Sequence, residues 1–401
     1  MAEFAKIQPS GPVWVPEALE EPVFVTRPRM PEKAAYKQAI DRLWDNKWLT
    51  NNGEFHRALE TRLQNLVGEG EVALTANGTL SLLLALKIAG VEPGKKIITT
   101  PFTFAATTHA IDWVGCEPVF ADIDPVTGNI DPAIVANLVD EDVAAVLPVH
   151  VFGTPCDHGA LQAICDDAGM PLVYDAAHSF ATKLDGRSVF ALGTASATSF
   201  HATKLFSTAE GGAVFVRSRE EKQLCDRFKN FGIASQDKIE RSGLNMKMSE
   251  FHAAFGLLGL DGVQHEIEQR QAIATTYMAR LAGIDGIRAV TTGIGFEPNW
   301  SYFAICVDEK RAGISRDDLF DALAALTIHC RKYFYPLTSH TPAYAVLETA
   351  GEGNLPVAHR FEREVMCLPI FGDLPLSSAG YIADAIRALV GYPPISNRGT
   401  L

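Results

Sequence analysis

The chain has 401 residues, of which 47% are hydrophobic and 21% charged, and its formal net charge is -13. One hydrophobic core rarely grows beyond a chain of about 250 to 300 residues, so this length predicts two folded domains. The negative charge, with no run of Lys and Arg to offset it, argues against nucleic acid as a partner. The N-terminus lacks the basic and apolar regions of a signal peptide, and no apolar stretch is long enough to span a membrane. We therefore expect a cytoplasmic protein.

The cysteines give no sign of a disulfide framework or of a metal site. They are seven in number, scattered, and contain no CxxC pair. Both observations argue against paired disulfides and against a zinc centre. We expect buried, reduced thiols and no bound metal. The seven positions are Cys116, Cys156, Cys165, Cys225, Cys306, Cys330 and Cys367.

Taken in chain order, residues 1–30 are rich in Pro and Glu and predict an extended N-terminal arm. From there to about residue 215, short apolar runs alternate with helix-length segments, which indicates an α/β fold with a mostly parallel sheet covered by helices. The run Val143–Val151 is apolar on both faces, as in strands that are buried on both sides. We expect a large domain over residues 31–262 and a smaller C-terminal α+β domain over residues 263–401.

The helical segments carry the expected start and stop signals. Asp157 is suited to cap a helix that ends at Gly169. A long helical segment from about Met248 to Leu281 leads into the second domain. There the strand-like run 301–309 precedes a helix with an apolar stripe over residues 377–391.

In an open α/β sheet, ligands bind beyond the carboxyl ends of the strands, so polar residues at those ends are the first candidates for a site. The segment "ALTANGTLSLLLALKIAG" predicts a strand that ends near Thr75, a tight turn at Asn77 and Gly78, and a helix that begins near Thr79. Free amides at this helix start would form an anion site. A simple strand-to-helix turn is the alternative reading.

A second segment, "PLVYDAAHSF", brings Asp175 to the end of an apolar strand, with His178 three residues later. Each residue has a structural alternative, since Asp often caps a helix and a lone His is usually part of the core. Together at a ligand-binding edge, they could hold an aromatic ring, with the carboxylate at a protonated ring nitrogen and the imidazole beside the ring.

The third segment, "SFHATKLFSTAEGG", puts Lys204 just beyond a strand that ends near Ser199. A lone lysine is most often a solvated charge. To form a Schiff base, its amine must be unprotonated part of the time, which requires burial or neighbouring positive charge. Ser199 and Thr203 are short enough to contact a phosphate beside it.

A phosphate site, an acid for a ring nitrogen and an amine nucleophile are the three groups that pyridoxal phosphate requires. Phe104 in "PFTFAATTHA" could stack on the ring, although a core position is its alternative. The motifs of other enzyme classes are missing, because the chain has no GxGxxG, Walker, GxSxG or HExxH sequence.

As a set, these segments resemble the DegT/DnrJ/EryC1/StrS family of sugar aminotransferases. The resemblance runs from "WLTNNGEF" to "LPIFGDL", and its motifs include "NGTLSLLLAL", "FADIDPVTGNID", "YDAAHSFAT", "SFHATKLFSTAEGGAVF", "FKNFGI" and "GLNMKMSEFHAAFGL". It implies a fold type I, aspartate-aminotransferase-like homodimer that binds pyridoxal phosphate, with active sites at the subunit interface.

The resemblance also implies roles for single residues. Lys204 would bond covalently to the cofactor and move protons, and Asp175 would pair with the pyridinium nitrogen. The other implied cofactor contacts are His178 near the ring hydroxyl, Phe104 on the ring, Gly78, Thr79 and Ser199 at the phosphate, and Asn230 from the other subunit.

The expected substrate is a nucleotide-linked keto sugar, with L-glutamate as the amino donor. Family members with His instead of the lysine are dehydratases, and this chain keeps Lys204. "SFHATK" further resembles the branch that aminates C4 of dTDP-4-keto-6-deoxyglucose. Lys247 and Arg331 are candidates to contact the diphosphate, and aromatics in "RKYFYPL" could flank the sugar or belong to the core. A 3-keto, GDP-linked or keto-inositol substrate, or a cofactor-binding regulator without turnover, remains open.

Overall fold

The large domain of the computed structural model, which describes residues 14–290 and 293–395, is built on one mixed sheet. Strands β2, β10, β9 and β6 are adjacent in that order, and strands β5, β3 and β4 continue the sheet. Parallel bridges from Val146 to Leu172 and from Val149 to Asp175 join the two parts. The strands are β2 (Glu71–Thr75), β3 (Lys96–Thr99), β4 (Glu117–Phe120), β5 (Val143–Leu147), β6 (Val173–Asp175), β9 (Ala195–Ser199) and β10 (Gly212–Val216).

Strand β10 runs antiparallel to both of its neighbours, whereas the β3–β4, β3–β5 and β6–β9 pairs are parallel. The predicted mostly parallel sheet is therefore confirmed. Alternate residues of each strand face opposite sides. In β10, for example, Ala213 and Phe215 pack into one core cluster and Val214 and Val216 into another.

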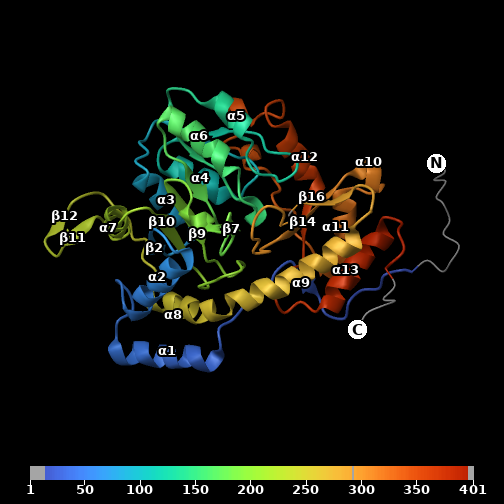
Figure 1. The fold of residues 1–401 in the computed structure, drawn as a ribbon, viewed down its shortest axis with the longest axis horizontal. Helices are drawn as coiled ribbons and strands as arrows, with labels where there is room; N and C mark the ends of the chain where they lie inside the picture. Colours follow the sequence, from blue (N-terminus) through green and yellow to red (C-terminus); the bar gives the residue numbers. More distant parts are fainter. Residues whose placement is uncertain (1–13, 291–292, 396–401) are drawn as a thin grey trace.

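Helices cover both faces of this sheet (Figure 1). Residues of α3, α4 and α7 pack on one face, and residues of α2, α6 and α8 pack on the other. The helices of this domain are α1 (Lys33–Asn46), α2 (Glu54–Val67), α3 (Gly78–Ile88), α4 (Ala105–Trp113), α5 (Pro132–Leu138), α6 (His158–Ala168), α7 (Arg219–Phe228) and α8 (Glu250–Gly259). As predicted, the Asp157 side chain caps α6 and Gly169 ends it in the left-handed conformation.

Two short hairpins extend from the large domain. One comprises β7 (Lys183–Leu184) and β8 (Arg187–Ser188), and the other β11 (Ile233–Ser235) and β12 (Lys238–Ile239). The β11–β12 hairpin protrudes at one end of the molecule, beside α7 (Figure 1).

The C-terminal part of the chain has a separate small sheet. It consists of the antiparallel strands β13 (Ile287–Ala289), β14 (Phe303–Val307) and β16 (Val365–Leu368). Its helices are α9 (Val263–Leu281), α10 (Glu309–Ala312), α11 (Arg316–Ala325), α12 (Pro356–Glu364) and α13 (Leu376–Leu389). The limits of the two domains, at residues 30 and 262, remain predictions.

The long helical segment expected from Met248 onward differs in detail. Helix α8 begins at Glu250 because the Ser249 hydroxyl accepts a hydrogen bond from the His252 amide and caps it. A 3-10 turn, η3 (Leu260–Gly262), then separates α8 from α9. Figure 1 shows α8 and α9 following one another from the large domain to the small one.

The described part of the arm, residues 14–30, is extended and lies against the C-terminal part. Strand β1 (Val23–Phe24) pairs in parallel with β15 (Ile328–His329). Residues 1–13 of the predicted arm lie outside the described residues.

A further cluster joins the two parts, since Phe102 and Phe152 pack with Phe334 and Phe361. All seven cysteines are buried and free, as expected. No helix among the described residues combines the length and apolar character of a membrane span.

Candidate active site

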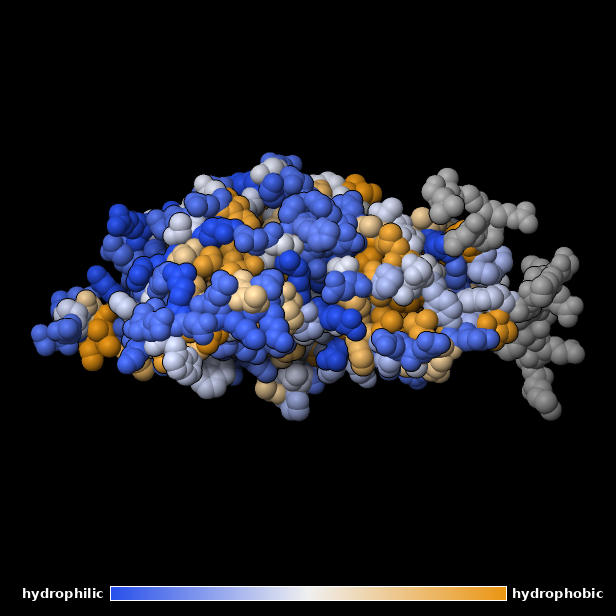
Figure 2. All heavy atoms as spheres, turned by 90° about the horizontal axis from the view of Figure 1, so that it is seen from below, coloured by the Kyte–Doolittle hydropathy of each residue, from blue (hydrophilic) through white to orange (hydrophobic). Residues whose placement is uncertain are grey.

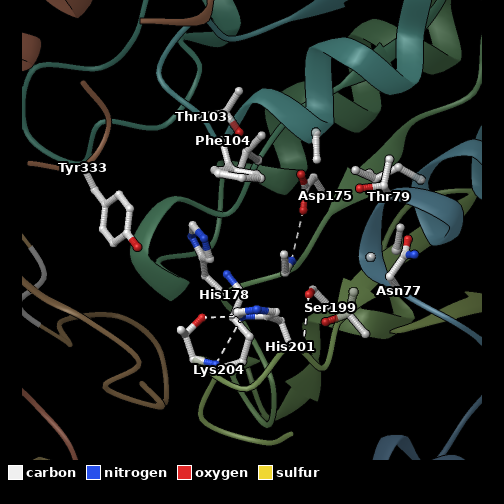
Figure 3. Close-up of a pocket in the computed structure, with 18 of the residues that line it drawn as sticks. Asn77, Thr79, Thr103, Phe104, Asp175, His178, Ser199, His201, Lys204 and Tyr333 are labelled. Atoms are coloured by element: carbon white, nitrogen blue, oxygen red, sulfur yellow. Dashed lines mark hydrogen bonds between the residues drawn. The ribbon is translucent and has the colours of Figure 1, made fainter. Parts of the chain in front are cut away.

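A cavity of about 430 Å³ opens at the carboxyl edge of the large sheet. Its walls include the ends of β6 and β9, the start of α3, the loop before α4, and residues from the C-terminal part of the chain. Eight of the ten predicted site residues line it, namely Gly78, Thr79, Phe104, Asp175, His178, Ser199, Lys204 and Arg331. Figure 3 shows Asn77, Thr79 and Ser199 on one side of the hollow and Tyr333 on the opposite side.

Lys204 lies five residues after the end of β9, in a turn where its amide donates to the His201 carbonyl at 2.9 Å. Its Nζ donates to the Tyr302 hydroxyl at 3.3 Å and lies 5.8 Å from the centre of that ring. Burial lowers the pKa of this amine, and the opposing effect of Asp175 is smaller. The lysine is therefore a partly buried amine in a cavity, and the solvated-charge reading is wrong for it.

Asp175 is the last residue of β6 and is 5% exposed. Both of its carboxylate oxygens are held: Oδ2 accepts from the Thr107 hydroxyl at 2.7 Å, and Oδ1 accepts from the Ala177 amide at 3.1 Å. The Thr103 hydroxyl lies 2.7 Å from that of Thr107 and extends the chain of hydrogen bonds to the cavity wall. Burial raises the pKa of Asp175, so a cation in the cavity would stabilise its charged form.

His178 is held as a neutral ring. Its Nδ1 accepts from the Phe152 amide at 3.3 Å, which leaves Nε2 as the nitrogen that carries hydrogen. The ring stacks on Phe334 with centroids 5.7 Å apart and meets the edge of Tyr302 at 4.8 Å. Burial, followed by Lys204 and His150, holds the pKa of His178 well below its usual range.

The start of α3 has the geometry of an anion site. Asn77 caps the helix, with Oδ1 accepting from the Leu80 amide at 2.9 Å. A Cβ atom added to Gly78 would lie 2.7 Å from the Cβ of Ser199, so only glycine allows this close approach of α3 and β9. The amides at the helix start and the hydroxyls of Thr79 and Ser199 then face the same cavity.

Phe104 precedes α4 and is 63% exposed, so it is not the core phenylalanine of the alternative reading. In Figure 3 its ring lies at the cavity, next to Asp175. Arg331 also lines the cavity, and its guanidinium lies 5.3 Å from the centre of the Tyr333 ring.

Two predicted residues do not line the cavity of their own chain. Lys247 Nζ donates to Asn230 Oδ1 at 2.8 Å, and the same amine lies 4.9 Å from the centre of the Phe231 ring. This pair lies near the β11–β12 hairpin, since Asn230 lies three residues before the start of β11. The expectation that Asn230 acts in the other subunit's site stays a prediction.

Several residues of the site could not be identified from the sequence. Tyr302, directly before β14, lines the cavity but occurs in a segment that reads as core. Thr107, inside α4, supports Asp175 without lining the cavity and occurs in a segment that reads as helix. His201 at the cavity rim makes hydrogen bonds with the Thr203 hydroxyl and amide at 2.9 and 3.2 Å. The only sequence signal for His201 was its place in "SFHATK". Tyr333 and Phe334 belong to "RKYFYPL", whose aromatics could flank the substrate or belong to the core. Both residues line the cavity, and Phe334 is also part of the buried core.

Residues 31–387 match the DegT/DnrJ/EryC1/StrS aminotransferase family. The chain belongs to this family. The predicted aminotransferase class is thus confirmed.

Family relatives share most of this chain. A dTDP-4-amino-4,6-dideoxy-D-glucose transaminase of Escherichia coli is 39% identical over 353 residues, which are 87% of this chain and 94% of the relative. The crystal structure of DesI in the presence of its TDP-sugar product is 35% identical, with a TM-score of 0.88 and 94% of both chains covered.

The structure of S. venezuelae DesV in complex with a ketimine intermediate is 27% identical, with a TM-score of 0.82, and covers 91% of this chain and 99% of DesV. These likenesses confirm the predicted fold type I architecture. The cavity at the carboxyl edge of the sheet, which holds Lys204 and Asp175, is the candidate active site.

Proposed function

We propose that the protein is a pyridoxal-phosphate-dependent aminotransferase that moves the amino group of L-glutamate to C4 of dTDP-4-keto-6-deoxy-D-glucose, giving dTDP-4-amino-4,6-dideoxyglucose. The observation that carries the proposal is an amine of lowered pKa, Lys204, in the same cavity as the buried carboxylate of Asp175. The choice of sugar rests on the transaminase relative that is 39% identical.

The residues of the cavity fit the cofactor. A buried carboxylate with raised pKa suits a protonated ring nitrogen, because the two charges would stabilise each other. The close packing of Gly78 on Ser199 brings the start of α3 and the Ser199 hydroxyl to the same cavity, where the helix amides suit a phosphate. A lysine amine whose pKa is lowered by burial suits covalent attachment to an aldehyde.

When bound, the cofactor supplies an electron-accepting ring and the carbon that carries the amino group between the two substrates. Asp175 keeps the ring nitrogen protonated, and Thr107 and the Ala177 amide fix the direction of its carboxylate. The Nε2–H of neutral His178 would be free to donate to the ring hydroxyl, since its Nδ1 is already occupied as an acceptor. Phe104 would cover one side of the ring.

Lys204 is the residue that moves protons. Burial lowers the pKa of its amine, which favours the neutral form and would suit Lys204 to accept the proton from Cα of glutamate and to pass it on within the cavity. Tyr302 accepts a hydrogen bond from Nζ at 3.3 Å and keeps the amine directed into the cavity. In the second half of the reaction the same amine moves a proton onto C4 of the sugar.

The diphosphate of the sugar nucleotide requires cationic contacts in this acidic protein. Arg331 at the cavity rim is one candidate. We further propose a homodimer in which Asn230 and Lys247 serve the cavity of the other subunit. Neither residue lines the cavity of its own chain, which supports this assignment.

The proposal is tested by incubating the purified protein with L-glutamate and a panel of dTDP-, UDP- and GDP-linked 3-keto and 4-keto sugars and a keto-inositol, and by identifying the products by mass and NMR. We expect the 4-amino sugar from the dTDP-linked 4-keto substrate, and none from Lys204→Ala. Turnover of only a 3-keto sugar, a GDP-linked sugar or a keto-inositol would replace the substrate assignment. Wild-type turnover by Lys204→Ala would exclude the role of Lys204.

A further inference from the structure

A compact group of ligating side chains lies outside the cavity described above. His340 ends the 3-10 turn η4 (Thr338–His340), and His359 and Glu362 lie in α12. Because they are three positions apart, the two α12 residues project from the same side of the helix. One nitrogen of each histidine and one oxygen of Glu362 all lie within 4.8 Å of one another.

Within this group His340 already contacts Glu362, whereas one nitrogen of His359 has no hydrogen-bond partner among the described residues. His340 Nδ1 is 3.1 Å from Glu362 Oε1. The centres of the two imidazole rings are 4.7 Å apart. His359 is 7% exposed, and its Nε2 is buried without any hydrogen-bond partner among the described residues. Such an orphaned buried nitrogen is unfavourable unless a ligand completes it.

The carboxylate is fixed in place before any ligand arrives. Glu362 is 6% exposed, and its Oε1 accepts a hydrogen bond from the Leu337 amide at 3.0 Å. That amide belongs to the segment that leads into η4. A second hydrogen bond on a ligating carboxylate holds it in one orientation, as in metal sites.

We propose that His340, His359 and Glu362 bind a divalent first-row transition metal ion of the zinc type. Two imidazoles and one carboxylate, with a fourth position open to water, form a ligand set that zinc adopts in proteins. Metal–nitrogen bonds of about 2.0 to 2.1 Å put tetrahedral ligand atoms about 3.3 Å apart, close to the 3.1 Å between His340 and Glu362. An ion pair of protonated His340 with Glu362 is the competing state, and it leaves His359 Nε2 without a partner.

The bound ion would join helix α12 to the turn η4, which follows the cavity-lining residues Arg331 and Tyr333 in the chain. Thr338, in the same turn as His340, receives a hydrogen bond from the Thr108 hydroxyl and donates to the Pro101 carbonyl, both at 3.1 Å. Arg331 and Tyr333 line the cavity a few residues earlier. Metal binding would therefore tie this segment to α12 and raise the melting temperature of the protein. The proposal does not depend on the substrate of the enzyme.

The test uses the cofactor-loaded protein without a histidine tag, treated with a chelator and transferred to a buffer without phosphate. Zn²⁺ binding is measured by calorimetry, and Co²⁺ binding by visible absorption at wavelengths longer than those of the cofactor. We expect one ion per chain, tetrahedral cobalt bands and a rise in melting temperature on metal addition. His359→Gln and His340→Gln should each weaken binding at least about tenfold.

The matched control is His265→Gln, which removes one exposed histidine of α9 and should bind like the wild type. His340 is exposed, so His340→Gln tests the proposal even if the buried His359→Gln fails to fold. Absence of Zn²⁺ and Co²⁺ binding to the wild type, or unchanged affinity in a folded His340→Gln or His359→Gln variant, would overturn the proposal.

Discussion

At the scale of single residues, the hydroxyl of Thr107 is the contact that gives Asp175 its direction. It donates to Oδ2 at 2.7 Å from inside α4, and burial makes every hydrogen bond to this carboxylate matter. A hydrogen bond to a charged group contributes about 1.5 to 3 kcal/mol. Thr107 does not line the cavity itself, so its role is to position Asp175.

We expect Thr107→Val to slow the half-reaction with glutamate about tenfold or more, because the Asp175 carboxylate loses one of its two hydrogen-bond donors. The rate is measured as the change in cofactor absorption after mixing. Thr108→Val is the matched control on the same helix, since the Thr108 hydroxyl donates to Thr338 instead. Equal rates for Thr107→Val and the wild type would remove Thr107 from this role.

The sequence predicted the residues that end strands better than those that support them. Asp175 and Lys204 follow apolar runs, and the carboxyl edge of a parallel sheet is where such residues meet. Thr107 could not be predicted, because a threonine inside a helix has the same pattern whether its hydroxyl is free or bonded to a distant carboxylate. Tyr302 directly precedes β14, and its approach to Lys204 depends on how the small sheet packs against the large one.

At the scale of elements, the contact between α3 and β9 depends on one residue without a side chain. A Cβ at Gly78 would be 2.7 Å from Ser199 Cβ and 3.2 Å from Ser199 Cα. Ser199 is paired with Gly212 in the sheet, so β9 cannot easily move away. The start of α3 would shift instead, and with it the amides that face the cavity.

Gly78→Ala should therefore weaken binding of pyridoxal phosphate about tenfold or more, since such overpacking costs roughly 1 to 3 kcal/mol. Affinity is measured by titrating the cofactor-free protein and following the absorption or quenching of fluorescence. Gly159→Ala is the control at the start of α6, where the nearest atom to an added Cβ lies at 3.8 Å. Unchanged affinity in Gly78→Ala would contradict the proposed phosphate position.

Helices α2 and α7 are joined by a buried set of charges beside a neutral histidine. Lys229, which is 2% exposed, lies 3.4 Å from Glu60 and 2.8 Å from Asp226. His56 is 1% exposed, and burial, followed by the charge of Lys229, lowers its pKa from 6.5 to about 4. The folded state thus disfavours protonated His56. The contribution of neutral His56 to the free energy of unfolding is therefore fully present above pH 6.5 and is lost as the pH falls toward 4.

Between pH 7 and pH 5, His56 should reduce the free energy of unfolding by about 2 kcal/mol, because only the unfolded chain takes up its proton there. Urea unfolding at the two pH values measures this difference. His56→Gln, which does not titrate, should show a fall that is smaller by about that amount. The same fall in both proteins would mean that His56 is not held neutral in the folded state.

Elements were predicted well where the signal is local. The alternation of apolar strands and capped helices is a property of neighbouring residues, and it predicted the three-layer arrangement. The two short strands β1 and β15 were missed, because they pair across about 300 residues of sequence and each is only two residues long. Such pairing depends on tertiary packing and leaves no periodic pattern.

At the scale of the whole molecule, one end carries exposed apolar side chains next to the Asn230–Lys247 pair. The β11–β12 hairpin and its flanks include Phe231, Ile233, Ile239 and Leu244, all among the exposed large apolar residues. Figure 2 shows apolar side chains at the end of the molecule where this hairpin protrudes. A partner subunit on this surface would cover them and bring Asn230 to a second cavity.

Mixed dimers test this arrangement. Asn230→Asp would oppose the cofactor phosphate with a negative charge, and Lys204→Ala lacks the amine, so we expect both parent variants to be inactive. If each site takes Lys204 from one chain and Asn230 from the other, a dimer of the two variants has one intact site. We expect co-expression to restore about half of the activity per mixed dimer. No recovery in isolated mixed dimers would contradict shared sites.

The most direct test of the account is the reaction of the purified, cofactor-loaded protein with L-glutamate alone. The cofactor absorption should shift to shorter wavelength, and one 2-oxoglutarate should form per chain, because Lys204 and Asp175 complete the first half-reaction without the sugar. In Lys204→Ala no such conversion should occur. A wild-type protein that keeps its yellow absorption and forms no 2-oxoglutarate would show a cofactor-binding protein without transaminase activity and would contradict the account.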